Sequence, residues 1–344
     1  SGNDLIYGHE DADKLYGDEG NDTIYGWDGN DQIEGGTGDD LILGDAGDDS
    51  IYGDLKSGES NSDGNDTITG GLGDDVIWGQ GGDDLIYGSS GDDTLRGGSG
   101  DDIIKGGSGN DRVIGQADND TLEGGDGDDL IYGDNESGES ITDGNDVIFG
   151  GTGDDEIYGR GGDDYLVGQE GKDTLTGGEG NDVFVLTSYD ITGPAQGDTI
   201  KDFVDGEDKI GLINLDFDSL TISQAGFGVD AITEITDAAG YTLAILEGVT
   251  SDLITADDFI SLNYDLSEVI DTTASFLDLD FDSLGISINP PKNISPDANG
   301  DSSANPDVPM TDDEPNFGDQ INSDLIDSLI NENPYDNYSI NDFI

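Results

Sequence analysis

The stretch GGSGNDRVI, residues 106–114, is one complete copy of the pattern that decides the fold. Glycines fill its first, second and fourth positions, an Asp stands sixth, and an apolar residue stands two positions after the Asp. The Asp returns with a period of nine residues from Asp4 to Asp182, in 19 nonamers broken by two short segments. All 19 copies have the Asp and the apolar residue, and 18 have Gly four positions after the Asp. Because these constraints share one period, they indicate a repeat architecture.

Each nonamer has the features of a turn followed by a short strand. Fixed glycines mark backbone that takes a positive φ or packs too closely for a Cβ, and one apolar residue between two variable ones predicts a three-residue strand. Such a strand cannot bury its apolar residue alone, whereas stacked copies can. We therefore expect an all-β fold, a parallel β-roll or β-solenoid of about 19 nonapeptide repeats with two nonamers per turn. Rows of Ile and Leu between its two sheets would form the core of residues 1–187.

The composition excludes several classes of protein. The 344 residues contain 81 Asp and Glu against 10 Lys and Arg, a formal net charge of -71, and no Cys. A nucleic-acid binder needs a basic surface, and an anionic membrane repels this charge. Disulfides, thiol chemistry and Cys-ligated zinc are impossible. No apolar stretch is long enough for a transmembrane segment, and the N-terminus has no signal-peptide pattern. Composition alone thus predicts a chain that folds only with a partner of opposite charge.

The repeated Asp residues predict a ladder of metal ligands. Stacking places equivalent Asp side chains about 4.8 Å apart on successive turns, where like charges repel. Ca²⁺ removes the repulsion because it accepts six to eight oxygens from carboxylates and flexible main-chain carbonyls, whereas Mg²⁺ demands strict octahedral geometry. Zinc prefers Cys or His, and the chain has one His. The expected metal ligands are Asp4, Asp13, Asp22, Asp31, Asp40, Asp49, Asp66, Asp75, Asp84, Asp93, Asp102, Asp111, Asp120, Asp129, Asp146, Asp155, Asp164, Asp173 and Asp182.

The nonamer G-G-x-G-x-D-x-U-x resembles the RTX, or haemolysin-type, calcium-binding repeats of secreted bacterial proteins. The resemblance covers residues 1–187 and implies that each Ca²⁺ is held between repeats i and i+2 by the Asp and main-chain carbonyls. Two columns of repeats give up to about 17 ions. The Asn or Asp before each ligand is expected to shape its own turn or to be a secondary ligand. The weakest or empty sites are expected at residues 10–18, 117–125 and 170–178, where the pattern is damaged.

Two eight-residue segments that share the sequence SGES interrupt the repeats, at residues 55–62 and 135–142. They lie 80 residues apart and each follows an even number of nonamers, which indicates duplication of a larger unit. If they leave the roll as loops, both leave the same edge; if each fills half a turn, they lie on opposite edges. They are either paired features for docking or glycosylation, or insertions that a solenoid tolerates.

The residue three positions after the ligand Asp is aromatic in 9 of 19 repeats. These side chains are expected to point outward from the sheets. They could stack on sugars or on a neighbouring molecule, and the simpler interpretation is packing between adjacent strands on an exposed sheet face.

The pattern changes after residue 187. Alternating apolar runs in residues 188–288 predict a β-rich cap over the open end of the roll. The segment from Asp198 to Ile210 resembles the flanking segment that caps RTX rolls in serralysin-type proteases and cyanobacterial RTX proteins. Residues 289–344 are rich in Pro, Asn and Asp, which is typical of a flexible tail, and the final residues 341–344 resemble a type I secretion signal.

No catalytic motif accompanies these features. The single histidine, His9, lies in a turn, and the sequence has no H-E-x-x-H, G-x-S-x-G or P-loop motif. We expect no enzyme activity. The resemblance implies a protein that is exported by the type I secretion machinery, folds on binding Ca²⁺ outside the cell, and is secreted or associated with the cell surface. Two functions remain open. One is a structural component of the cell surface or matrix that self-associates or binds glycans. The other is the C-terminal module of a larger enzyme, toxin or adhesin whose active domain lies before Ser1.

Overall fold

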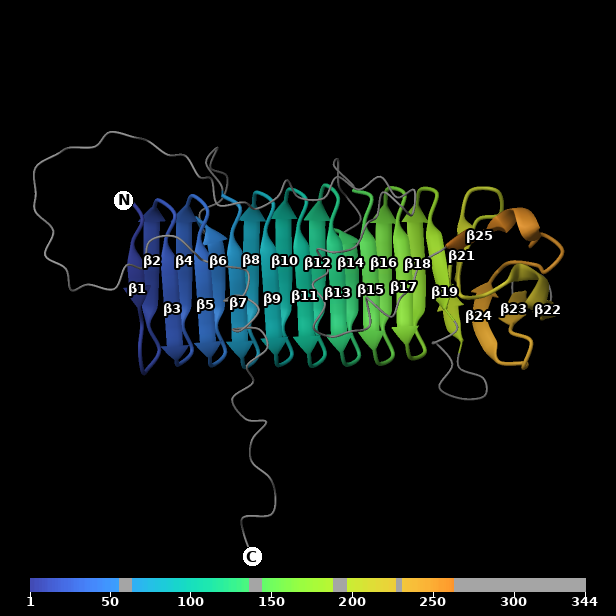
Figure 1. Ribbon diagram of the computed structural model, residues 1–344, viewed down its shortest axis with the longest axis horizontal. Helices are drawn as coiled ribbons and strands as arrows, with labels where there is room; N and C mark the ends of the chain where they lie inside the picture. The colour runs from blue at the N-terminus through green and yellow to red at the C-terminus, as the bar shows by residue number, and fades with distance from the viewer. Residues whose placement is uncertain (56–63, 136–143, 188–196, 227–230, 263–344) are drawn as a thin grey trace, which may run out of the picture. The chain divides into compact units, whose positions relative to one another are not determined.

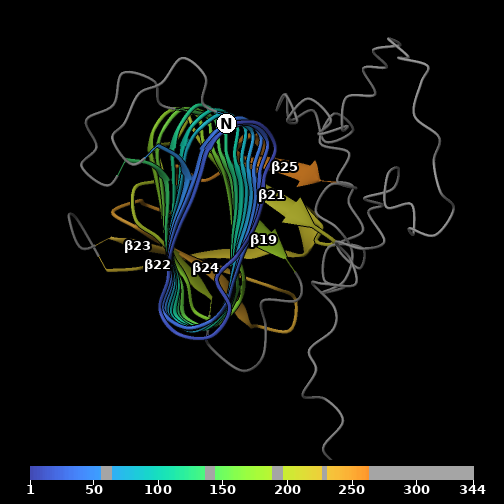
Figure 2. The ribbon, with the colours of Figure 1, turned by 90° about the vertical axis from the view of Figure 1, so that its left-hand side faces the viewer.

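The computed structural model describes residues 1–55, 64–135, 144–187, 197–226 and 231–262. Within them the chain coils as two long sheets that face each other across one core (Figures 1 and 2). From β1 to β21 successive strands alternate between the two sheets, so neighbouring strands within each sheet are two apart in chain order. This alternation confirms the expected parallel β-roll with two nonamers per turn.

The odd-numbered strands other than β23 form a 12-stranded sheet. In spatial order they are β1 (Leu5–Tyr7), β3 (Thr23–Asp28), β5 (Leu41–Ala46), β7 (Thr67–Leu72), β9 (Leu85–Ser90), β11 (Ile103–Ser108), β13 (Thr121–Asp126), β15 (Val147–Thr152), β17 (Tyr165–Glu170), β19 (Val183–Thr187), β21 (Lys209–Ile213) and β25 (Phe259–Leu262).

The even-numbered strands, together with β23, form a 13-stranded sheet. In spatial order they are β2 (Lys14–Glu19), β4 (Gln32–Thr37), β6 (Ser50–Asp54), β8 (Val76–Gly81), β10 (Thr94–Ser99), β12 (Arg112–Ala117), β14 (Leu130–Asp134), β16 (Glu156–Gly161), β18 (Thr174–Glu179), β20 (Asp198–Ile200), β24 (Thr242–Glu247), β23 (Ile232–Thr236) and β22 (Thr221–Ala225).

Most strands of the roll are longer than the predicted three residues. In β10 and β12, for example, Thr94 pairs with Arg112 and the pairing continues beyond the turn glycine to Ser99 and Ala117. The strands have six residues because the first turn positions, which were expected to be loop, also pair with the turns above and below. Backbone hydrogen bonding between turns therefore continues around the bend.

The core is the row of apolar side chains that stand two positions after each Asp. From Ile24 to Phe184, each of these side chains has no exposed surface. The same cluster continues without a break into the C-terminal strands, through residues such as Ile200, Ile210 and Leu246. A single core thus joins the repeats to the segment that follows them.

Truncation of one core side chain tests this architecture. Ile86 is fully buried near the middle of the roll, so we expect Ile86→Ala to lower the free energy of unfolding in saturating Ca²⁺ by about 2–5 kcal/mol, because it leaves a cavity. The measurement is denaturant unfolding followed by circular dichroism. Leu72→Ala is the control, since Leu72 is 50% exposed, and its expected effect is below about 0.5 kcal/mol. Equal losses in the two variants would contradict the assigned core.

Neither SGES segment occupies half a turn of the roll. Strand β5 pairs with β7 and β13 with β15, as they would without an interruption. Each segment therefore leaves the roll after an even-numbered strand, β6 or β14, and the chain returns to the next odd-numbered strand. The register of the flanking strands therefore excludes the half-turn alternative and places the bases of both segments at the same edge, while most of each segment lies outside the described residues.

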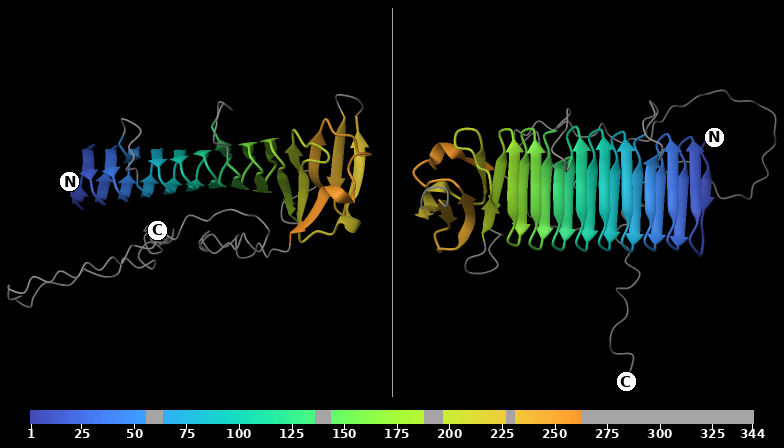
Figure 3. Two further views of the ribbon diagram at one scale, coloured as in Figure 1. Left: turned by 90° about the horizontal axis from the view of Figure 1, so that it is seen from above. Right: turned by 180° about the vertical axis from the view of Figure 1, so that it is seen from behind.

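Parallel pairing continues past Thr187, where the nonamers end. Strand β20 pairs with β18 and β21 with β19, and both pairs are parallel. Beyond them, β24, β23 and β22 form an antiparallel meander joined to β20, while β25 pairs in parallel with β21 (Figure 3). Two short 3₁₀ helices, η1 (Phe217–Ser219) and η3 (Ala256–Asp258), connect these strands.

Residue 187, where the roll was expected to end, is the end of the sequence repeat. The parallel pairing of strands continues past it through β21, before the antiparallel strands begin. The expected tail at 289–344, its secretion signal and the end of the expected cap at 188–288 lie outside the described residues.

Candidate metal-binding ladder

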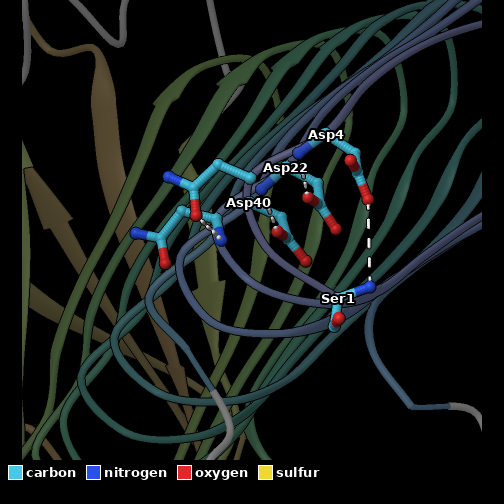
Figure 4. Close-up of polar contacts among 6 residues, drawn as sticks. Ser1, Asp4, Asp22 and Asp40 are labelled. Atoms are coloured by element: carbon cyan, nitrogen blue, oxygen red, sulfur yellow. Dashed lines mark hydrogen bonds and ion pairs between the residues drawn. The ribbon is translucent and has the colours of Figure 1, made fainter.

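The repeated Asp residues lie at the turns in two columns, one on each edge of the roll, and each Asp is joined to the next in its column. The backbone N–H of Asp84 donates to Oδ1 of Asp102 at 2.8 Å, and that of Asp93 donates to Oδ1 of Asp111 at 2.8 Å. The same bond recurs along both columns from Asp4 and Asp13 to the C-terminal end. Figure 4 shows the first three carboxylates of one column, those of Asp4, Asp22 and Asp40. All 19 predicted Asp residues belong to these columns.

The second carboxylate oxygen is used differently. Along the columns, one Oδ2 atom after another is buried without a hydrogen-bond donor, in Asp22, Asp31, Asp40, Asp49, Asp66, Asp75, Asp84, Asp93, Asp102, Asp111, Asp120, Asp129, Asp155, Asp164 and Asp173. Burial of a charged oxygen without a partner costs several kcal/mol, in the range of ~2–7 kcal/mol even for neutral polar groups. A row of such oxygens indicates that cations bind between the turns and offset this cost.

The first glycine of each turn keeps space open in front of this oxygen. A Cβ on Gly106 would overlap Oδ2 of Asp111 and the carbonyl oxygen of Gly124, one turn further on. A Cβ on Gly88 would likewise overlap Oδ2 of Asp93 and lie 2.6 Å from the carbonyl oxygen of Gly106. Carboxylate and main-chain carbonyl oxygens therefore converge beside each glycine, which is the mixed oxygen set that Ca²⁺ accepts.

No three acidic or histidine side chains among the described residues come together as a metal cluster. This finding agrees with the geometry of the turns, in which one or two carboxylates face a point that main-chain oxygens also line. The donors are all hard oxygens, so the residues present fit Ca²⁺ and do not fit zinc.

In the folded chain without a cation, burial raises the pKa of many of these carboxyl groups toward neutral pH. Burial raises the pKa of Asp75 to about 8, and the charges of Asp93 and Asp49 add to the effect. Burial likewise raises the pKa of Asp40 to about 7 and of Asp155 to about 8. Burial also places the pKa of Asp102 well above its ordinary value. The N–H bond to Oδ1 lowers each pKa but does not outweigh burial.

The Asn or Asp before each ligand forms a second, outer ladder. The N–H of Asp83 donates to Oδ1 of Asn65 at 3.0 Å, and the N–H of Asp101 donates to Oδ1 of Asp83 at 3.1 Å. These side chains do not shape their own turn as expected, because their acceptor oxygens reach the N–H one turn further along, and their role as secondary ligands stays a prediction. The inner ladder runs in the opposite sense, since each inner Oδ1 accepts from the turn before it.

Two further rungs come from the segment after the repeats. Oδ1 of Asp198 accepts the N–H of Asp173 at 3.1 Å, and Oδ1 of Asp208 accepts the N–H of Asp182 at 3.0 Å. Both Asp198 and Asp208 are buried. They bring the hydrogen-bonded intervals to 19, two more than the sequence predicted.

Sequence reasoning missed these two rungs although a signal existed. Ile200 and Ile210 each stand two residues after their Asp, as the apolar residue does in every nonamer. The glycine four positions after each Asp is missing, since Asp202 and Leu212 stand there, so the nonamer pattern does not detect them. The side chain of Asp202 provides the hydrogen bonds that a further turn would provide. Its two carboxylate oxygens accept the N–H groups of Gly177 and Gly178, each at 3.0 Å.

The damaged repeats keep the same backbone. Asp11 and Asp118, which replace glycine, adopt φ angles of 79° and 73°, and Asp tolerates this region better than most residues. The rungs to Asp120 and Asp173 are present. Low affinity at residues 10–18, 117–125 and 170–178 stays a prediction, since the altered side chains and not the fold would cause it.

The outward aromatic side chains pack between neighbouring strands of one sheet. Tyr52 stacks on Trp78 with ring centroids 4.3 Å apart, and Tyr132 stacks on Tyr158 at 4.9 Å. The guanidinium of Arg160 lies 5.0 Å from the centroids of both Tyr132 and Tyr158. The expected packing between adjacent strands is confirmed for these pairs.

A parallel β-roll whose turns carry two columns of buried carboxylates defines a calcium-binding repeat protein. The family model of the RTX calcium-binding nonapeptide repeat matches seven overlapping stretches, residues 1–33, 25–55, 60–95, 87–122, 105–137, 140–175 and 158–186. These matches cover more than half of the 344 residues. The chain therefore belongs to the RTX calcium-binding repeat family, whose repeats bind calcium and whose members are typically secreted.

Two solved structures are similar to parts of the chain. The crystal structure of the extracellular lipase LipA from Serratia marcescens has 19% identity and a TM-score of 0.29, and the match covers 61% of this chain and 42% of the lipase. The solution structure of the AlgE6R3 subunit of mannuronan C5-epimerase from Azotobacter vinelandii has 23% identity and a TM-score of 0.21, with 57% and 94% covered. The match thus spans less than half of the lipase chain.

No curated protein matches the sequence. Among the described residues, no helix has the length and apolar character that a membrane crossing requires.

Proposed function

We propose that this chain is a secreted protein whose β-roll folds on binding Ca²⁺ outside the cell and serves as a structural component of the cell surface or extracellular matrix. The observation that carries the proposal is the row of buried Oδ2 atoms without hydrogen-bond donors. The proposed ligands are the 19 Asp residues of the nonamers, with Asp198 and Asp208 as the last rung of each column.

The negative charge of the roll explains why folding would require calcium. Extracellular calcium modules bind at about 10⁻⁴–10⁻³ M, so a low-calcium cytosol would leave the carboxylates unbalanced and the chain unfolded. An unfolded chain suits passage through a type I secretion channel. Outside the cell, ion binding and folding would occur together because the site does not exist in the unfolded chain.

Calcium binding and assembly can be measured on the same sample. We expect equilibrium dialysis of the full chain at pH 7.5 to give a stoichiometry that approaches one ion for each of the 19 intervals. Light scattering and electron microscopy of the calcium-loaded chain should show ordered assemblies. A chain that binds calcium but stays monomeric at high concentration would favour the alternative, a secretion and folding module of a larger enzyme, toxin or adhesin.

A further inference from the structure

The three arginines of the chain all lie on one sheet of the roll. Arg96 is on β10, Arg112 on β12 and Arg160 on β16, and each side chain is half-buried. The consecutive strands β8, β10, β12, β14 and β16 of this sheet carry two further charged residues, Glu156 and Asp134, and Asp134 is buried with 1% of its surface exposed. The outward side of these strands, the arginine face, is therefore a positive region in a chain with a formal net charge of -71.

The aromatic rings of the arginine face are covered on both sides. Trp78 lies between two neighbouring strands, with the ring of Tyr52 at 4.3 Å and the guanidinium of Arg96 at 5.9 Å from its centroid. Tyr132 is enclosed in the same way, by the guanidinium of Arg112 at 5.3 Å and by a stacked tyrosine at 4.9 Å. Covered rings do not offer a sugar a surface for stacking. The face instead presents guanidinium groups, which pair with carboxylates through parallel N–H bonds.

Exposed carboxylates line the edge of the roll opposite the SGES segments. Those segments follow even-numbered strands, whereas Asp74, Asp92 and Asp128 lie in turns that follow the odd-numbered strands β7, β9 and β13. All three side chains are exposed. Oδ1 of Asp74 accepts the N–H of Asp92 at 2.9 Å, and Oδ1 of Asp128 accepts the N–H of Asp154 at 2.9 Å. The outer ladder thus holds the carboxylates of this acidic edge at the spacing of the turns.

The arginine face and the acidic edge have the same repeat. Both follow the distance between adjacent strands, about 4.8 Å per turn, because both are built from the same stacked nonamers. A second roll lying alongside can therefore bring several carboxylates to several guanidinium groups at once. Opposite charges at matched positions favour this contact, and carboxylates that are already hydrogen-bonded in place lose little freedom on binding.

We propose that the arginine face binds the acidic edge of a second copy of this chain, so that rolls associate side by side. The proposal rests on the proposed structural function and names the surfaces through which the chain would assemble. The contact joins two different surfaces, so a copy bound through its face still has its edge for the next copy. A contact of this kind extends from copy to copy into an open array unless its rotation closes a ring.

The first variant reverses the charge of the arginine face in the full chain, with Arg96→Glu, Arg112→Glu and Arg160→Glu. The matched control makes the same change of charge outside the face, with Lys14→Glu, Lys105→Glu and Lys201→Glu. Assembly is measured by light scattering in saturating Ca²⁺ at pH 7.5, and folding by circular dichroism. The face variant should need at least about tenfold more protein to assemble because its contacts become repulsive, whereas the control should assemble like the unmodified chain.

The second variant reverses the charge of the acidic edge, with Asp74→Lys, Asp92→Lys and Asp128→Lys. The roll accepts Lys at this repeat position, because Lys172 occupies it and its N–H donates to Oδ1 of Asp154 at 3.0 Å, as in the other turns. This edge variant should also fail to assemble alone. An equal mixture of the face and edge variants should assemble again, because the new Glu residues then meet the new Lys residues.

Four results decide the proposal. Assembly of the face variant at the concentration of the unmodified chain would overturn it, and so would a mixture that does not recover. A face variant that assembles normally but no longer binds immobilised chondroitin sulfate would show that the face takes an acidic polysaccharide instead. An unmodified chain that stays monomeric would overturn the proposed structural function together with this contact.

If either variant does not fold in Ca²⁺, the salt dependence of the unmodified chain is measured at constant free Ca²⁺. The Debye length falls from about 10 Å to about 3 Å between roughly 0.1 M and 1 M NaCl. The protein concentration needed for assembly should therefore rise at least about tenfold over this range. Assembly that is unchanged by the added salt would overturn the proposal.

Discussion

Removal of calcium at neutral pH should abolish most of the β structure of this chain. Residues 1–187 carry 48 Asp and Glu against 7 Lys and Arg, and the inner ladder stacks carboxylates on successive turns with their Oδ2 atoms buried. Without a cation, each ionised rung faces a charge of the same sign above and below it at low dielectric. The unfolded chain relieves this repulsion, so the equilibrium should move toward it.

The measurement is far-ultraviolet circular dichroism of the full chain at pH 7.5 with an excess of chelator, followed by calcium addition. The β signal should be lost with chelator and return cooperatively at about 10⁻⁴–10⁻³ M free calcium. Magnesium at the same ionic strength is the control, and it should restore little of the signal because it retains its waters in a flexible oxygen site. A β signal that persists in chelator would contradict the assigned role of the ladder.

Acidification should restore part of the β structure in the absence of calcium. Burial raises the pKa of Asp111 to about 6, of Asp129 to about 7 and of Asp155 to about 8, while an unfolded Asp has a pKa near 3.9. The folded metal-free roll therefore binds more protons than the unfolded chain between about pH 4 and pH 8, so its stability falls as the pH rises through this window. Protons take the place of calcium because they neutralise the same carboxylates.

The experiment is a pH titration in chelator, followed by circular dichroism. The β signal should be weak at pH 8 and grow as the pH falls toward 5. With calcium present, acidification should have the opposite effect on binding, because protons compete for the ligands and the calcium midpoint should rise. A metal-free chain whose β signal does not change between pH 8 and pH 5 would show that the buried carboxyl groups do not control folding.

The sequence predicted the fold of the repeats well because one local rule is repeated many times. An inward apolar residue such as Ile104, a turn glycine such as Gly106 and an Asp such as Asp111 occur at fixed spacing, and stacking makes every copy contact its own kind. The buried row, the two columns and the loop-like insertions follow from that spacing. The outward stacking of Tyr132 on Tyr158 follows from it too.

The partner of each polar atom did not follow from the spacing. The two oxygens of the Asp102 carboxylate differ, because Oδ1 accepts the N–H of Asp84 and Oδ2 is buried without a hydrogen-bond donor. The outer residue Asp83 bonds the next turn and not its own. Both facts depend on side-chain direction and on the distance between turns, which a repeat pattern does not contain.

The sequence by itself determined the period, the core row, the two columns of Asp and the preference for a hard cation, because each depends on residue type at a fixed interval. Only the tertiary structure decided that Asp198 and Asp208 continue the columns. These two residues lack the glycine four positions further on and reach the ladder through the pairing of β20 with β18 and of β21 with β19. The physical reason is that a carboxylate joins the site through its position in space, and backbone geometry beyond the repeat sets that position.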